Sequence, residues 1–203
     1  MSTEIIAVLD RSYSMEPRKS SAISGFNEFL NGQQHDGDDA NLTLCLFDNE
    51  IHVPVFRQPI NEVQELDETS YVPRGSTSLY DAIGSLLTRF KKIIKNDTKK
   101  EVDGGIVVIL TDGEENSSQR FNQNNVKALI ETFEGVYDWE VIYLGANQDA
   151  FSVGHNLGIR ATTAMGISKC VDYLPDARGF EGAYNTMSSS TVDYRARKRS
   201  EKM

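Results

Sequence analysis

Two short apolar segments without polar interruption place the strongest constraint on the fold of this chain. Residues 5–9 read Ile-Ile-Ala-Val-Leu, and residues 105–110 read Gly-Ile-Val-Val-Ile-Leu. A strand with one face in water alternates apolar and polar side chains, whereas a strand covered on both faces is apolar throughout. Both segments are therefore predicted to be central strands of a sheet that carries helices on both faces.

Amphipathic segments follow the apolar ones, which is the order expected of helices that connect parallel strands. At 79–94, for example, apolar residues recur at helical spacing, and Lys91 and Lys92 fall in the last turns, where cations suit the helix dipole. The same criteria predict the remaining elements. They lie at 19–31 (helix), 123–134 (helix), 140–144 (strand), 150–157 (short helix), 161–167 (weak strand) and 179–188 (helix).

One pair of strands is predicted to be antiparallel. The apolar runs at 42–47 and 51–56 are separated only by Asp48-Asn49-Glu50, which is typical of a hairpin turn. The expected fold class is therefore α/β. It is a Rossmann-like, doubly wound and mostly parallel central sheet with one antiparallel edge strand and helices on both faces.

The length of 203 residues suits a single domain, which we place at 3–190. Residues 191–203 are predicted to form a basic C-terminal tail, since 194–199 read Tyr-Arg-Ala-Arg-Lys-Arg. A loose, solvated tail is favoured over one that contacts RNA or acidic lipid.

The composition excludes several classes of function. The chain has 30 acidic against 21 basic residues and a formal charge of −9, which argues against sequence-independent binding to nucleic acid. No stretch approaches the roughly 18 uninterrupted apolar residues that a membrane span requires. Cys45 lies in an apolar run and is predicted to be a small core residue. With no disulfide framework and no signal peptide, a cytoplasmic location is expected.

Oxygen-bearing side chains gather in three loops next to the predicted elements. Asp10, Ser12 and Ser14 come directly after the first buried strand. Thr77 precedes the helix at 79–94, and Asp112 follows the second buried strand. Because the carboxyl ends of the strands form the ligand crevice of an open α/β sheet, two carboxylates and three hydroxyls are expected to meet there.

This set of side chains predicts a site for one hard divalent cation. Mg²⁺ prefers oxygen ligands and usually keeps several waters, and Mn²⁺ and Ca²⁺ are alternatives. Asp10 and Asp112 would form a like-charge pair that a cation relieves. Because the hydroxyls are neutral, the ion keeps positive charge and an open coordination position. A Glu or Asp of a partner protein would fill that position.

The order of the three loops resembles a known family. Asp10-x-Ser12-x-Ser14, then Thr77 after a Gly-containing turn, then Thr111-Asp112-Gly113 is similar to the motif of the von Willebrand factor type A (VWA) domain. The resemblance covers roughly residues 3–170. It implies a metal-ion-dependent adhesion site, in which a bound divalent metal docks an acidic residue of another protein.

The resemblance also implies a role for each residue of the site. Ser12 and Ser14 would touch the metal directly. Thr77 and Asp112 would alternate between direct and water-mediated contact in open and closed forms. Asp10 would act through water and by orienting its loop.

Two further features bear on the resemblance. Tyr13 stands between the serines, where the family often has Gly, and it would restrict the loop or offer an aromatic rim to the partner. The segment 144–150, followed by Gly154 and 157–159, is similar to stand-alone bacterial and bacteriophage members. That similarity implies an intracellular microbial protein.

Simpler roles stay open from the sequence alone. Ser12, Ser14 and Thr77 are residue types that cap helices, and Asp112-Gly113 is a common turn dipeptide. Each of these explanations weakens when the three loops are considered together.

The function predicted from the sequence is a metal-dependent protein-binding module without enzymatic activity, compatible with an accessory subunit of a larger complex. The alternative is a Mg²⁺-dependent hydrolase such as a phosphatase. Aspartyl-phosphate enzymes place a second acid two residues after the nucleophilic Asp, and Ser12 stands at that position. The chain also has no P-loop, so nucleotide hydrolysis would have to come from another protein.

Overall fold

A single sheet organises the computed structural model, which describes residues 2–37, 39–99, 101–146, 149–163, 166, 168–174 and 176–201. Its six strands follow the order β3-β2-β1-β4-β5-β6. The strands are β1 (Ser2–Asp10), β2 (Ala40–Phe47), β3 (Ile51–Pro59), β4 (Val102–Thr111), β5 (Glu140–Ala146) and β6 (Cys170–Tyr173).

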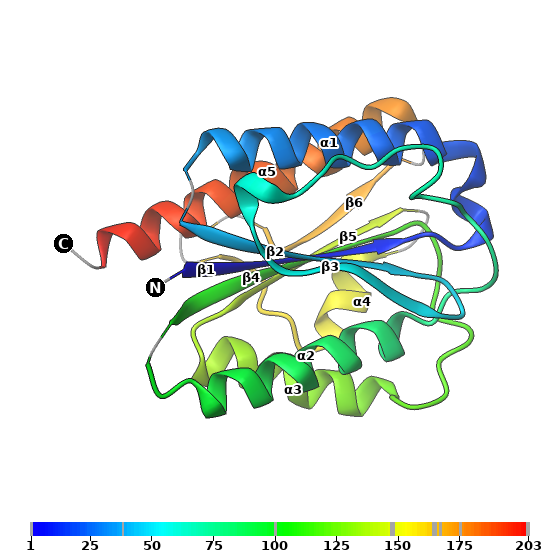
Figure 1. Cartoon of the computed structure of the whole chain (residues 1–203). Coiled ribbons are helices and arrows are strands. Elements are labelled where there is room, and N and C mark those ends of the chain that lie inside the picture. Colours follow the sequence, from blue (N-terminus) through cyan, green and yellow to red (C-terminus); the bar gives the residue numbers. More distant parts are fainter. Residues whose placement is uncertain are drawn as a thin grey trace.

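Helices cover both faces of this sheet (Figure 1). Helices α1 (Lys19–His35) and α5 (Ala177–Ser200) lie on one face. The other face carries α2 (Leu79–Asn96), α3 (Gln123–Val136) and α4 (Ala150–Asn156). Two short 3-10 helices, η1 (Tyr13–Arg18) and η2 (Ile60–Glu62), complete the regular elements of the described residues.

Strand β1 shows why the central segments lack polar residues. Ile5 and Leu9 pack into the cluster under α1 and α5, while Ile6 and Val8 pack into the cluster under α2 and α3. All four side chains are buried, so both faces of the strand contribute to the hydrophobic core. The prediction of a doubly covered central strand is confirmed.

The strand directions also agree with the predicted fold class. Strand β1 pairs in parallel with β2 and β4, and β4 and β5 continue the parallel part of the sheet. Strand β3 pairs antiparallel with β2 and forms the edge of the sheet.

No helix in the described part of the chain is both long and apolar enough to cross a membrane.

The weak final strand was predicted at the wrong place. In the described part of 161–167, Thr162 forms only an isolated bridge to Ser168. The strand that pairs with β5 is β6, at 170–173, and positions 164, 165 and 167 lie outside the described residues. Tyr173 explains this choice, because its ring packs edge-on against Phe180 of α5 at 5.0 Å and so anchors β6 to the core.

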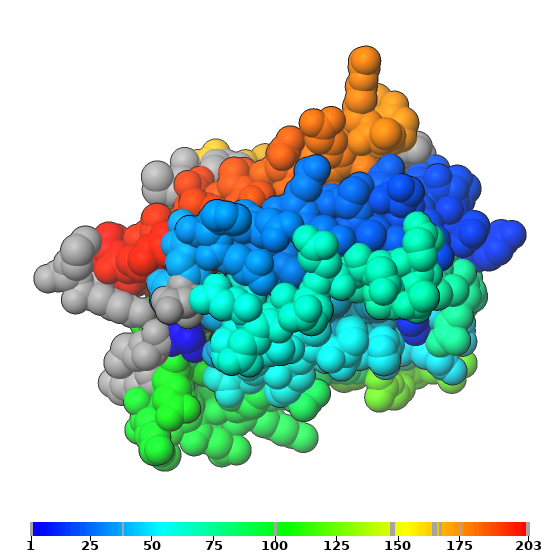
Figure 2. Space-filling model, turned by 45° about the horizontal axis from the view of Figure 1, so that its top comes forward, coloured from blue at the N-terminus to red at the C-terminus, as the bar shows by residue number. Residues whose placement is uncertain are grey.

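The C-terminal segment differs from the predicted loose, basic tail. Helix α5 continues to Ser200, and the described residues 191–201 pack along the domain. Figure 2 shows the orange and red residues of α5 lying along the blue residues of α1. Arg195 is completely buried, and its guanidinium donates to the carbonyl oxygens of Gln33 and Gly37 and to the carboxylate of Asp39. Carbonyl and carboxylate groups of a distant segment thus pair with Arg195 and allow this basic residue to be buried.

Candidate functional site

The ends of two adjacent strands form the base of the candidate site. Asp10 is the last residue of β1, and Thr111 is the last residue of β4. The Thr111 hydroxyl donates to Asp10 Oδ2 at 2.5 Å, and the backbone N–H of Ser12 donates to Asp10 Oδ1 at 2.7 Å. The Asp10 carboxylate therefore fixes the loop that follows β1 against the end of β4.

A hydrogen-bonded row of side-chain oxygens connects the loop that follows β1 with the loop that follows β4. The hydroxyl oxygens of Ser12 and Ser14 lie 3.0 Å apart, and the Ser14 hydroxyl donates to Asp112 Oδ1 at 2.6 Å. Ser12 and Asp112 are buried, whereas Ser14 is exposed, so this row of oxygens is accessible to solvent at Ser14. Ser12 occupies the N-cap position of η1 but its side chain makes no capping hydrogen bond. Capping therefore does not account for this hydroxyl.

Thr77 lies beside this group because its backbone is hydrogen-bonded to Asn116, in the loop that follows β4. Its backbone N–H donates to Asn116 Oδ1 at 2.9 Å, and its carbonyl accepts from the N–H of Asn116 at 3.0 Å. A Cβ added to Gly113 would lie 3.3 Å from Thr77 Oγ1 and 3.6 Å from Ser14 Oγ, so both hydroxyls flank Gly113. The N-cap position of α2 belongs to Ser78 instead of Thr77.

The structure therefore brings the five predicted residues together beside the ends of β1 and β4. These strand ends lie on the right of Figure 1. Asp10, Ser12, Ser14 and Asp112 belong to one hydrogen-bonded group, and Thr77 adjoins it across Gly113.

Burial disfavours the charged form of Asp10 at this edge. It raises the pKa of Asp10 to about 6, against hydrogen bonds from Thr111 and Ser12 that favour the charged form, and the charge of Asp112 adds a small further rise. A nearby cation favours the ionised carboxylate. Carboxylate and hydroxyl oxygens are also the ligand types that hard divalent cations prefer, so the residues present fit such an ion.

Three residues of the site were not singled out from the sequence. Arg18 Nη1 donates to the carbonyl of Ser14 at 2.7 Å and to Asp112 Oδ2 at 2.8 Å. The hydroxyl of Tyr71 donates to the Asp10 carbonyl, and that of Tyr173 donates to the Thr111 carbonyl at 3.1 Å. Arg18 lies four residues after Ser14, so its closeness to the first loop was visible in the sequence. The two tyrosines come from distant segments, and no local pattern indicates them.

Solved structures identify the architecture. The chain matches the crystal structure of the SpRpn10 VWA domain over 92% of its own length and 95% of that chain, with a TM-score of 0.62 and 12% sequence identity. This chain has the von Willebrand factor type A fold. The prediction from the three loops is thereby confirmed at the level of the fold.

Other VWA structures support the same assignment. The von Willebrand factor type A protein from Catenulispora acidiphila matches 94% of the chain at 13% identity and a TM-score of 0.57. The ArnB paralog VWA2 from Sulfolobus acidocaldarius matches 95% at 17% identity and a TM-score of 0.56. The matches span 43% and 45% of those two longer chains. No protein-family model matches the sequence, and no curated protein matches it significantly.

The candidate site differs from a metal site built on a cluster of acidic residues, Cys or His. Within the residues that the structure describes, no three or more His, Cys, Asp or Glu side chains group closely enough to hold a metal. The candidate site contributes only two carboxylates and draws its other oxygens from hydroxyl groups.

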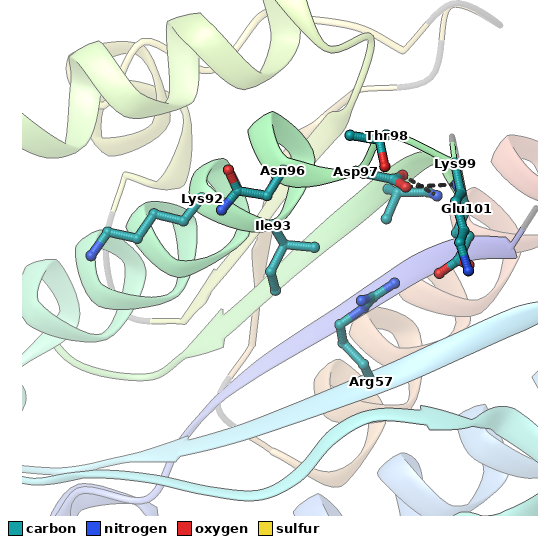
Figure 3. Close-up of a pocket in the computed structure, with 9 residues that line it drawn as sticks. Arg57, Lys92, Ile93, Asn96, Asp97, Thr98, Lys99 and Glu101 are labelled. Carbon is teal, nitrogen blue, oxygen red and sulfur yellow. Dashed lines mark hydrogen bonds between the residues drawn. The ribbon is translucent and has the colours of Figure 1, made fainter.

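Two hollows lie at opposite ends of the strands. One, of about 530 Å³, adjoins the candidate site and is lined by Ser76 and Ser78, which flank Thr77 in the sequence, and by Ser117. The other, of about 470 Å³, lies beside the start of β4, where the guanidinium of Arg57 points toward the loop that carries Asp97 (Figure 3).

Two charged side chains that line the second hollow, Arg57 and Asp97, make hydrogen bonds within the domain. The guanidinium of Arg57 donates twice to the buried carboxylate of Glu4, and the carboxylate of Asp97 accepts from the backbone N–H groups of Glu101 and Val102. The edge that carries Thr77 therefore stays the candidate site for a ligand.

Proposed function

We propose that this VWA domain is a metal-dependent protein-binding module. Asp10, Ser12, Ser14, Thr77 and Asp112 would hold one divalent cation, and Mg²⁺ suits this set of oxygen ligands. The cation would in turn bind a Glu or Asp of a partner protein. The observation that carries the proposal is the continuous group of carboxylate and hydroxyl oxygens, drawn from three loops, that opens to solvent at Ser14.

The chemistry of the oxygens supports binding of a further anionic ligand. Hydroxyl oxygens are neutral, so an ion held largely by Ser12, Ser14 and Thr77 keeps much of its charge. Mg²⁺ also keeps several waters as ligands, and such waters are exchangeable for an external oxygen. A carboxylate is the protein group that best combines negative charge with a hard oxygen donor.

The surroundings of the site suit a protein ligand. Tyr13 lies between the two serines and is 70% exposed, so its ring is available to pack against a partner. On the other side, the hollow beside Thr77 is lined mainly by hydroxyl, amide and charged groups. An acidic residue flanked by one apolar and one polar side chain would match this arrangement, which has the anchor and polar rim of protein interfaces.

Its context in the cell is part of the same proposal. We propose a cytoplasmic microbial protein that serves as an accessory subunit of a larger complex and binds its partner without catalysis. The cysteines Cys45 and Cys170 are both free and buried, which is compatible with a reducing compartment.

Calorimetric titration with Mg²⁺ tests the metal site directly. The wild-type protein should bind one ion, and Asp112→Ala should weaken binding by at least about a hundredfold, equal to about 2.7 kcal/mol. Asp67→Ala is the matched control, because that carboxylate is exposed on a loop and should leave the affinity unchanged. Circular dichroism should show both variants folded. Equal Mg²⁺ affinity of Asp112→Ala and the wild type would refute the site.

Partner binding tests the second half of the proposal. A protein captured from the native cell should bind the wild-type domain in Mg²⁺ and be released by EDTA, and Asp112→Ala should not retain it. Retention of the same partner in EDTA by both proteins would show that docking does not use the metal.

A further inference from the structure

We infer that Arg18 sets the net charge of the cation site, and that this charge makes the metal-loaded domain select a carboxylate over a neutral oxygen ligand. The inference rests on the proposed function, because it concerns the same site. It adds a residue that lies outside the predicted ligand set, and it gives that residue a role in specificity.

The position of Arg18 ties two of the ligand-bearing loops together. One nitrogen, Nη1, donates to the Ser14 carbonyl at 2.7 Å and to Asp112 Oδ2 at 2.8 Å. Asp112 has a fully buried side chain, while that of Arg18 is 20% exposed. The guanidinium thus reaches from the end of η1 into the base of the site and places a cation directly on a buried carboxylate.

The two oxygens of Asp112 have separate tasks. Oδ2 accepts from Arg18, and Oδ1 accepts from the Ser14 hydroxyl, which lies next to Ser12. A metal held by the two serines would therefore meet Oδ1, and Arg18 would keep Oδ2. Arg18 does not have to leave when the ion binds, so its charge belongs to the loaded site as well as to the metal-free one.

The charges within this group then determine which ligand fits. Two ionised carboxylates and one guanidinium leave a single negative charge on the group. A divalent cation turns this into a single positive charge, and one external carboxylate brings it to zero. Without Arg18 the loaded site would be neutral, and a carboxylate ligand would leave a net negative charge next to the buried carboxylate of Asp112, which is unfavourable.

Neighbouring arginines do not supply the same charge. Arg11 and Arg74 each pair with the buried carboxylate of Asp48 at 2.9 Å. Arg74 also pairs with Glu50 at 2.6 Å. Arg18 is the guanidinium that these contacts place on a proposed ligand of the metal.

This assignment predicts opposite effects on the two binding steps. Removing the positive charge of Arg18 lowers repulsion toward the incoming cation, so Mg²⁺ should bind more tightly. The same change removes attraction toward an external carboxylate, so that ligand should bind more weakly. A role confined to holding Asp112 in position would instead weaken Mg²⁺ binding.

The experiment compares Arg18→Gln, which loses the charge but keeps an N–H donor, with Arg18→Lys, which keeps the charge. Mg²⁺ affinity is measured by calorimetry at pH 8. Acetate and acetamide are titrated into the Mn²⁺-loaded proteins, and displacement of metal-bound water is followed by water-proton relaxation. Arg74→Gln is the control, because it removes an arginine at the same edge that does not contact Asp112.

For Arg18→Gln we expect Mg²⁺ affinity to rise about three- to tenfold and acetate affinity to fall by a similar factor. Arg18→Lys and Arg74→Gln should stay within about twofold of the wild type for both ligands. Acetamide should bind more weakly than acetate to the wild type and should show no dependence on Arg18.

Three results would overturn the inference. Weaker Mg²⁺ binding by folded Arg18→Gln would leave Arg18 only a positioning role, and unchanged acetate affinity would remove the role in specificity. If Arg18→Gln does not fold, failure of folded Arg18→Lys to keep the acetate preference refutes the inference equally. Absence of Mg²⁺ binding by the wild type would instead refute the proposed function itself, and the first titration reveals it.

Discussion

Two groups of charged side chains lie near opposite ends of the strands, and they differ in net charge. The α1–α5 cluster comprises Asp36, Asp39, Arg195 and Arg199, with two carboxylates facing two guanidinium groups. The candidate site has two carboxylates, Asp10 and Asp112, and one guanidinium, that of Arg18, which pairs with Asp112. One group is neutral in itself, and the other retains a negative charge.

The pKa values of two aspartates express this difference. Burial works against ionisation of Asp39, but the hydrogen bond and charge of Arg195 outweigh it and lower the pKa of that carboxyl. For Asp10 burial dominates and raises the pKa to about 6. A buried carboxylate with no cation of its own weakens the fold unless a ligand compensates it, so the second group is suited to binding and the first to stability.

The largest expected effect comes from breaking the balanced cluster. Arg195→Met should lower the free energy of unfolding by about 3 kcal/mol or more, because Asp39 and the Gln33 carbonyl lose a buried partner. Urea denaturation measures the loss, and Mg²⁺ affinity should not change. Arg178→Met, at an exposed position of the same helix, should stay within about 0.5 kcal/mol of the wild type. Equal stability of the two variants would contradict the cluster's structural role.

Relieving the unbalanced site should change the pH dependence of stability. The pKa of Asp10 is about 6 in the folded protein, above its ordinary value of 3.8, so the folded state binds this proton more tightly between those values. Free energy of unfolding should therefore fall as pH rises through that range in EDTA, by about 3 kcal/mol from this residue. Asp10→Asn should remove that decline in urea titrations from pH 4 to pH 7.5. An unchanged slope would show that Asp10 is not destabilised by burial.

Asp39→Asn should have the opposite sign, which separates the two groups of charges more clearly. Because the pKa of Asp39 is lowered, its ionised form stabilises the fold above pH 3.8, and that contribution is lost as the pH falls through the lowered pKa. The variant should therefore lose stability at neutral pH and change little in strong acid, as urea titrations at both pH values would measure. A gain in stability at neutral pH would place Asp39 in the same class as Asp10.

The smallest effect is expected at Gly113, where the site is crowded but the substitution changes no charged group. In Gly113→Ala the new methyl group would lie 3.3 Å from Thr77 Oγ1 and 3.6 Å from Ser14 Oγ, so Mg²⁺ affinity should fall about five- to tenfold. Stability should change by about 1 kcal/mol or less. Gly182→Ala in α5 meets no atom within 4 Å, should leave Mg²⁺ affinity unchanged, and should stabilise the helix slightly. Equal Mg²⁺ affinities of the two alanine variants would show that crowding at Gly113 does not affect metal binding.

Local sequence patterns are sufficient to predict the order of the sheet elements and the positions of the three loops. The apolar run at 5–9 has no polar face to turn toward water, so it had to become a strand covered on both sides. Asp10, Thr77 and Asp112 then lie beside the ends of predicted elements, and parallel strands bring such ends to one edge. These inferences depend on periodicity and on neighbouring residues, which a sequence displays directly.

Which distant groups meet is a property of the folded chain alone. The segment 194–199 looks like a solvated basic tail until carbonyl and carboxylate groups around 33–39 enclose Arg195. Strand β6 lies at 170–173 because the edge of β5 and the ring of Phe180 select it over 161–167. Arg18 meets Asp112 across 94 positions of the chain. Burial and charge pairing depend on the distance in space between residues far apart in the chain, and local patterns do not encode that distance.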